Sequence, residues 1–262
     1  MKLQLKLEED DMYEERTYRQ MTDKNRTKSF VVKYELSDLL ISVDWSSYNI
    51  NLPGLVLKYL MKLYKTINTY IIKNPTFYES LIPLKDSNSD IAIINDMLAA
   101  ACIGGVGPMA TIAGAISEYL GRFLIYDCNV HDVFIENGGD IFVYSQSRYI
   151  DTVIYCGDKA VLKSLNVHIK NFENTLGICT SSGKIGHSFS YGIADAVTII
   201  SSSAIVADAY ATYFCNLIKT KNDIDKILKK INDYELILGI ICVCDDNIGI
   251  FGQLELLSIT SN

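Results

Sequence analysis

The stretch VFIENGGDIFVYS, residues 133–145, holds two short runs of apolar residues on either side of a polar turn. Val, Ile, Phe and Tyr favour extended backbone, whereas Asn, Gly and Asp favour tight turns. NGGD, residues 137–140, therefore predicts the turn between two strands. Asn137 and Asp140 also place polar groups at a bend where backbone can approach a ligand closely. NGGD thus has both a structural and a functional interpretation.

Further β-type runs surround this hairpin along the chain. SFVVKYELSDLLISVD, residues 29–44, predicts two strands around a polar break. Other strands are expected within 149–156, 165–171, 176–182 and 195–201, with a final pair at 236–244 and 247–257. Because strands follow one another and helices are segregated from them, we predict an α+β fold. Its sheets should be mostly antiparallel and flanked by helices.

Helices are predicted where apolar residues recur at helical spacing. Residues 55–73 carry such a stripe, with lysines on the other face and Pro75 beyond the end. Further helices are expected over 90–103, 108–122, 203–219 and 223–235. Ser203 is a suitable N-cap, because a serine hydroxyl can accept a hydrogen bond from a free N–H of the first turn.

Composition sets limits on the class of protein. The chain has 262 residues, 49% hydrophobic and 21% charged, which is typical of a globular protein. We predict a single domain over 1–262, with 1–28 as a poorly packed extension or an edge strand. A net charge of −7 argues against nucleic-acid binding. Without a long apolar run, neither a signal peptide nor a membrane span is expected, and a cytoplasmic location follows.

The seven cysteines are scattered through the chain. Only Cys242 and Cys244 are close, and their spacing on a strand places them on one face. Zinc sites usually show two CxxC-like clusters or histidines at fixed spacing, and the sequence has neither. We therefore expect reduced, mostly buried thiols rather than a metal cluster.

A glycine-rich turn at residues 104–107 leads into a helix that begins with Pro108. Free N–H groups at a helix start, reached through flexible glycines, can hold a phosphate. Gly105 and Gly107 are candidates for this role. Tight packing explains the same glycines, and the small residues of the helix are compatible with a homodimer.

Two further features suggest chemistry. Asp208 and Thr212 stand four residues apart and share one helical face, and their oxygens suit Mg²⁺. The structural alternative is an Asp favoured by the dipole near a helix start. TSSGKIGH, residues 180–187, ends in one of the three histidines of the chain, set in a polar turn. A solvated loop and a functional site both explain His187.

Taken in order, these features resemble the ApbE-like family, the FAD:protein FMN transferases. That family shows an NxGGD element, a TSG strand end, a histidine, a strand and an aDAlaT helix start. The corresponding segments here are ENGGD at 136–140, TSSG at 180–183, His187, AVTII at 196–200 and ADAYAT at 207–212. The resemblance covers about residues 90–220 and is closest to a shorter, cytoplasmic branch related to that family.

The resemblance implies an ApbE-like fold, a bound FAD or FMN and an Mg²⁺ held by Asp208 and Thr212. It also implies that His187 is the catalytic residue, acting as general base or proton shuttle. Together with the glycine-rich turn, it assigns to the cofactor site Gly105, Gly107, Asn137, Gly138, Gly139, Asp140, Thr180, Ser181, Ser182 and Gly183.

The chain departs from the family's KGxxxD pattern, since AGAISE at 113–118 has Ala113 for the lysine and Glu118 for the aspartate. Three hypotheses therefore stand. The first is an Mg²⁺-dependent enzyme that transfers or hydrolyses an FMN or nucleotidyl group. The second, favoured by Ala113, is an inactive flavin- or nucleotide-binding module. The third treats every motif as packing and predicts no ligand.

Overall fold

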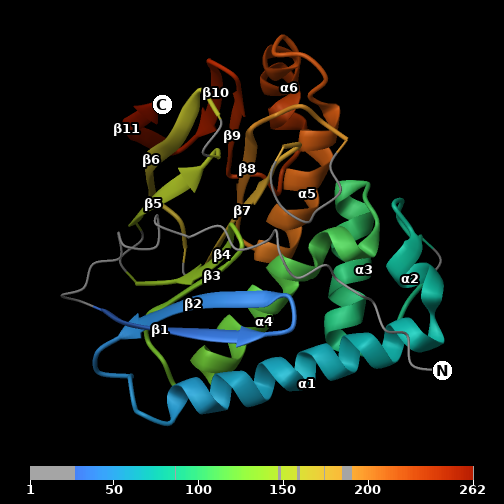
Figure 1. Ribbon diagram of the computed structural model, residues 1–262, viewed down its shortest axis with the longest axis vertical. Helices are drawn as coiled ribbons and strands as arrows, with labels where there is room; N and C mark the ends of the chain where they lie inside the picture. Colours follow the sequence, from blue (N-terminus) through green and yellow to red (C-terminus); the bar gives the residue numbers. More distant parts are fainter. Residues whose placement is uncertain are drawn as a thin grey trace, which may run out of the picture.

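The computed structural model describes residues 27–85, 87–146, 149–157, 160–173, 175–184 and 191–261. A chain of antiparallel pairings joins eight of its strands into one sheet, in the order β1-β2-β3-β4-β7-β8-β9-β10 (Figure 1). These strands are β1 (Thr27–Tyr34), β2 (Ser37–Asp44), β3 (Val133–Asn137), β4 (Asp140–Tyr144), β7 (Thr175–Ser181), β8 (Ala196–Ser201), β9 (Gly239–Cys244) and β10 (Asn247–Gly252).

A smaller antiparallel sheet, in the order β11-β6-β5, packs against part of the large one. Its strands are β5 (Tyr149–Tyr155), β6 (Leu162–Lys170) and β11 (Leu254–Ser261). Buried residues of both sheets share a core, including Leu165 and Val167 from β6 with Ile241 and Val243 from β9. The antiparallel α+β fold predicted from sequence is confirmed.

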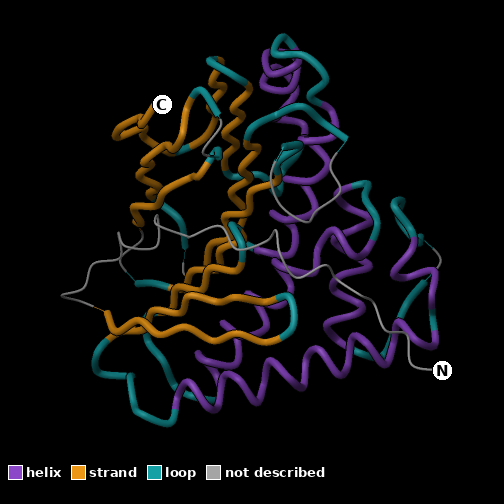
Figure 2. Tube along the Cα trace, viewed as in Figure 1, coloured by secondary structure: helices purple, strands orange, loops and turns teal. Residues whose placement is uncertain are grey.

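Helices cover the other face of the large sheet, where the main core lies (Figure 2). They are α1 (Leu52–Lys73), α2 (Pro75–Glu79), α3 (Ala92–Gly104), the 3-10 turn η2 (Pro108–Thr111), α4 (Ile112–Tyr126), α5 (Ala204–Leu217), α6 (Asp223–Lys230) and the 3-10 turn η3 (Ile231–Asp233). Helix α5 packs on β7 and β8, and α4 packs on β3 and β4. The two helices also contact each other, and α5 contacts β4 as well.

The prediction of one strand over 247–257 is wrong. The segment is divided into two strands at Gly252. Its φ of +112° is accessible to glycine and strained for other residues. A Cβ there would also lie 2.4 Å from the Leu238 carbonyl oxygen. The chain therefore bends, so that β10 completes the large sheet and β11 joins the small one.

Residues 1–26 of the predicted N-terminal extension lie outside the described residues, while Thr27 and Lys28 belong to β1 at an edge of the large sheet. In the described part of the chain, no single helix has the length and apolar character of a membrane span. Only α3 with Pro108–Tyr126, a pair bent by 101°, meets those criteria together. Five cysteines are buried, as expected: Cys156, Cys179, Cys215, Cys242 and Cys244.

Candidate functional site

Helix α4 packs closely against α5 at Gly114. A Cβ on Gly114 would lie 2.4 Å from the Ala204 carbonyl oxygen and 2.9 Å from the Asp208 Cβ. The absence of a side chain lets the Gly114 amide reach Asp208 and donate a hydrogen bond of 2.9 Å to its Oδ2. The first turn of α4 therefore holds the carboxylate that the sequence singles out as a metal ligand.

The NGGD turn lies against the same turn of α4. Asn137 Nδ2 of the side chain donates to the Ala113 carbonyl at 3.5 Å, and Ser117 Oγ donates to the Asp140 carbonyl at 3.2 Å. Inside the turn, the Gly139 amide donates to Glu136 Oε1 at 2.9 Å. Gly138 and Gly139 have φ of +68° and +103°, so the turn uses the freedom that the sequence predicts.

The end of β7 adds hydroxyl groups to this cluster. Cys179 pairs with Asp140 across the strands, and Ser181 lies two residues further on, so all three share the face toward α5. Ser181 Oγ and Thr212 Oγ1 are 3.1 Å apart and hydrogen-bonded. Thr180 points to the opposite face, where its hydroxyl bonds that of Thr198 at 2.8 Å.

Asp140 and Asp208 form a buried acidic pair, with 8% and 7% of their surfaces exposed. Burial raises the pKa of Asp140 well above its ordinary value, and the charge of Asp208 raises it further, against hydrogen bonds from Cys179 and Thr180. Burial also raises the pKa of Asp208 to about 7, although hydrogen bonds from the Gly114 and Ala113 amides oppose the shift. The pair favours a proton or a cation between the carboxylates.

One oxygen of this pair has no partner. Among the described residues, Asp140 Oδ1 is the buried side-chain oxygen or nitrogen without a hydrogen bond. An orphaned buried carboxylate oxygen costs free energy unless a ligand satisfies it. No group of three or more His, Cys, Asp or Glu side chains in the described ranges suits a metal. Mg²⁺ nevertheless fits, because it needs one or two carboxylates and takes its other oxygens from hydroxyls, water and substrate phosphates.

The other predicted residues are placed as follows. Gly105 ends α3 in the left-handed region, which favours glycine, and a Cβ on Gly107 would lie 1.9 Å from the Ser80 carbonyl oxygen. Backbone conformation explains the first glycine and packing explains the second. Ser182 Oγ accepts from the Lys184 amide at 3.0 Å, and the Gly183 amide bonds the Ala194 carbonyl. His187 lies outside the described residues.

Glu118 has a structural role that the sequence did not reveal. It is 4% exposed, and its Oε2 accepts from Ser203 Oγ and from the Ile205 amide at the start of α5. Its spacing of four residues from Arg122 was the available signal, since the two side chains form an ion pair on α4.

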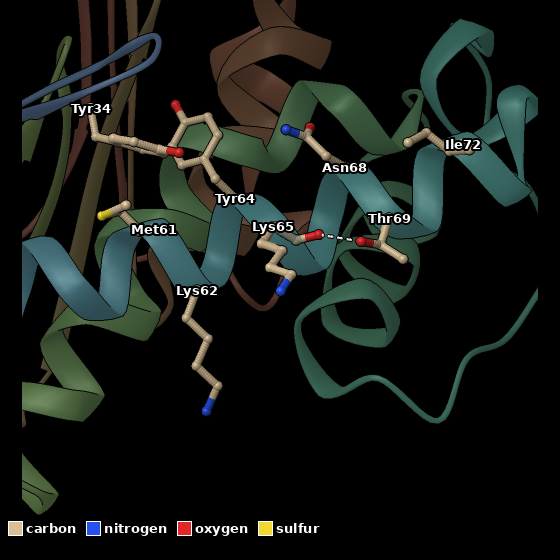
Figure 3. Close-up of a pocket in the computed structure, with 8 residues that line it drawn as sticks. All are labelled: Tyr34, Met61, Lys62, Tyr64, Lys65, Asn68, Thr69 and Ile72. Atoms are coloured by element: carbon tan, nitrogen blue, oxygen red, sulfur yellow. Dashed lines mark hydrogen bonds between the residues drawn. The ribbon is translucent and has the colours of Figure 1, made fainter.

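A separate groove lies on the outer face of α1 (Figure 3). Tyr34 and Tyr64 extend along it, Lys62 points away from the helix, and Thr69 Oγ1 donates to the Lys65 carbonyl at 2.7 Å. None of the predicted site residues that the structure describes lines this groove.

The sheet arrangement and the meeting of the NGGD turn with α5 define an α+β protein of the ApbE-like class. Two solved structures are similar in fold. The apo flavinyl transferase ApbE of Pseudomonas stutzeri aligns with a TM-score of 0.52 at 12% identity, covering 86% of this chain and 94% of that one. A mutant of the flavin transferase ApbE from Vibrio cholerae aligns with a TM-score of 0.53 at 10% identity, covering 86% and 96%.

Sequence comparison identifies the family. The family described as "AbpE bacteria" (AbpE_bact) matches residues 19–247. A UPF0280 protein of Methanocaldococcus jannaschii is 34% identical over 223 residues, 83% of this chain and 88% of the relative. The chain belongs to this AbpE_bact family.

Proposed function

We propose that the chain binds a flavin nucleotide, FAD or FMN, together with Mg²⁺, and that it transfers or hydrolyses the FMN or nucleotidyl group. The observation that carries the proposal is the buried pair of carboxylates, Asp140 and Asp208, beside hydroxyls at a glycine turn. Such a pair is costly in a core and useful beneath a metal-bound pyrophosphate. The similarity in fold to flavin transferases is compatible with this function.

Asp208 and Thr212 are the proposed protein ligands of Mg²⁺. They stand one turn apart on α5, and the hydrogen bond between the Ser181 and Thr212 hydroxyls directs Thr212 at the end of β7. Bound Mg²⁺ would offset the negative charge of a pyrophosphate. Asp140, with its free Oδ1, is available to accept from a water or hydroxyl in the same cluster.

The backbone of two turns is proposed to hold the nucleotide. Gly138 and Gly139 have no Cβ, and at Gly139 a Cβ would only just touch Thr180, so this turn has room for a close neighbour. Ser182 and Gly183 follow the end of β7, and His187 comes next in the polar segment of the sequence. The Gly139 and Gly183 amides already bond Glu136 and Ala194, so the proposal relies on close approach of these turns and on their hydroxyl groups to contact phosphate oxygens.

His187 is proposed as the proton acceptor of the reaction. In transfer, an acceptor hydroxyl would attack the FMN phosphorus, the bond from that phosphorus to the AMP oxygen would break, and the hydroxyl proton would pass to His187. With water in place of the hydroxyl, the same step gives FMN and AMP. A general base of this kind typically contributes about 10²–10⁴-fold to the rate.

The experiment is to incubate purified protein with FAD and Mg²⁺ and to follow AMP and FMN by chromatography and flavinylated protein by mass spectrometry. AMP release that depends on Mg²⁺ and is lost in Asp208→Asn supports the enzyme. Equal AMP release by Asp208→Asn or in excess EDTA would contradict it.

Ala113 favours a second candidate, a flavin-binding module without catalysis. The lysine of the family pattern would add a positive charge at position 113, next to the Gly114 amide that bonds Asp208, and alanine cannot. Tight FAD binding with no AMP after long incubation would select this module. A cytoplasmic location and a homodimer complete the proposal, and light scattering after size-exclusion chromatography tests the dimer.

A further inference from the structure

The start of α5 is hydrogen-bonded to Glu118, a buried carboxylate of α4. Glu118 Oε2 accepts hydrogen bonds from Ser203 Oγ at 2.8 Å and from the Ile205 amide at 3.2 Å. Ser203 is the N-cap residue, and its hydroxyl accepts from the Val206 amide at 3.4 Å. Glu118 and Ser203 thus satisfy two of the N–H groups that a helix start leaves free. A carboxylate in this position is also favoured by the helix dipole.

A second contact joins the same two helices one turn away. The Gly114 amide bonds Asp208, and Gly114 precedes Glu118 by four residues, one turn of α4. On α5, Asp208 follows Ala204, the first helical residue, by the same interval. The Glu118 and Gly114 contacts therefore join the two helices at two positions, one helical turn apart. Together they fix how far α5 is displaced along its axis relative to α4.

The buried charge of Glu118 has its own counter-ion. Arg122 Nη2 donates to Glu118 Oε1 at 2.5 Å, and Arg122 Nη1 donates to Asp96 Oδ2 at 3.3 Å. Tyr119 Oη also donates to Asp96 at 2.8 Å. This network links the partly exposed Arg122 to the start of α5. An ion pair that is balanced in this way avoids leaving an unpaired charge in the core.

We propose that Glu118 is a positioning residue of the candidate site, which sets the distance between Asp208 and the Gly114 amide by capping α5 from α4. The expected effect on cation affinity rests on the proposed function. The effect on the geometry of Asp208 does not. Without Glu118, α5 can slide or fray at its first turns. Asp208 then loses the amide that orients its carboxylate toward the ligand.

A residue that only stabilises the fold would lower the melting temperature without changing the site. The matched control is therefore Asp223→Ala. Asp223 accepts hydrogen bonds from the Lys219 and Thr220 amides next to α6, so its loss also removes a carboxylate at a helix start. Asp208 takes no part in these hydrogen bonds.

The experiment compares Glu118→Ala, Glu118→Gln and Asp223→Ala with the unaltered protein. Hydrogen exchange of the Gly114 amide reports the contact to Asp208, and Mn²⁺ titration reports cation affinity. We expect Glu118→Ala to speed exchange of the Gly114 amide and to weaken Mn²⁺ binding about tenfold, the usual effect of losing an outer-shell partner. Glu118→Gln keeps an acceptor for Ser203 and Ile205 and should restore most of both properties.

The two proposals fail in different ways. If Gly114 exchanges at the same rate in Glu118→Ala as in the unaltered protein, or equally fast in Asp223→Ala, the positioning role is wrong. If Glu118→Ala speeds that exchange but the unaltered protein binds no Mn²⁺, the positioning of Asp208 holds and the proposed function is wrong. If Glu118→Ala does not fold, Glu118→Gln alone provides the test, since it should then exchange Gly114 at nearly the unaltered rate.

Discussion

Gly114 and Asp208 lie 94 residues apart in the chain, yet the Gly114 amide donates a 2.9 Å hydrogen bond to Asp208 Oδ2 inside the core. The bond exists because Gly114 has no side chain, since a Cβ would collide with Ala204 and Asp208. One hydrogen bond thus joins two segments that sequence reasoning connects only through a resemblance.

Gly114→Ala should separate α4 from α5. The added methyl group must displace backbone at Ala204, so we expect a loss of about 1–3 kcal/mol in the free energy of unfolding. Urea unfolding measures it. Gly54→Ala is the control, because Gly54 is in a helix with nothing within 4 Å of its Cβ position. That control should be neutral or stabilising, and a Gly114→Ala protein as stable as the control would contradict the close contact.

Asp208→Asn should stabilise the metal-free protein at high pH. Burial raises the pKa of Asp208 to about 7 from an ordinary 3.8, so the folded state binds a proton more tightly than the unfolded state does. The contribution of Asp208 to stability therefore falls as the pH rises from about 4 through 7. In EDTA, the melting temperature of Asp208→Asn relative to the unaltered protein should be higher at pH 8 than at pH 5. An equal difference in melting temperature at both pH values would contradict the raised pKa of the buried Asp208 carboxyl group.

Asp44 should have the opposite pH dependence. Burial opposes its ionisation, but hydrogen bonds from Ser46, Asp132, Ser47 and His131 outweigh it and lower its pKa to about 2 from 3.8. The stability that Asp44 contributes is present above about pH 4 and is lost as the pH falls toward 2. The difference in stability between the unaltered protein and Asp44→Asn should be constant from pH 8 to pH 5 and should shrink below pH 4. Acid titration followed by circular dichroism measures this, and a constant difference down to pH 2 would refute the role.

His187→Ala should abolish turnover without unfolding the protein. If His187 accepts the proton of the attacking hydroxyl, AMP release should fall by about 10²–10⁴-fold. FAD affinity and melting temperature should stay close to those of the unaltered protein. His131, which is exposed, supplies the control substitution His131→Ala. Unaltered AMP release in His187→Ala would remove this residue from the mechanism.

Local chemistry made much of the fold predictable. Residues 133–145 form the expected hairpin because glycines in the left-handed region join two apolar runs. Ser203 caps α5 as expected, because its hydroxyl reaches the Val206 amide. The bend at Gly252 was missed because one glycine within an apolar run resembles an ordinary strand residue. The bend is needed because β10 and β11 belong to two different sheets that pack on each other, and this packing is not visible in the sequence.

The sequence named residues that lie together in the structure but not the contacts between them, and their roles as site residues stay predictions. The resemblance named Asp140, Ser181, Asp208 and Thr212, and the structure brings these four together. Side chains alternate between the two faces of a strand, so the Thr180 hydroxyl lies on the face of the sheet opposite to Ser181. The TSSG motif alone does not reveal this. Glu118 was noted only as a departure from a pattern, because its partners on α5 are 85 and 87 residues away.

The most direct measurement is a crystal structure with FAD and Mn²⁺, with the cation located by its anomalous scattering. The account predicts a Mn²⁺ peak within coordinating distance of the Asp208 carboxylate and the Thr212 hydroxyl, with the flavin phosphates beside the NGGD turn. A flavin bound elsewhere, or a Mn²⁺ peak that does not contact Asp208, would contradict it.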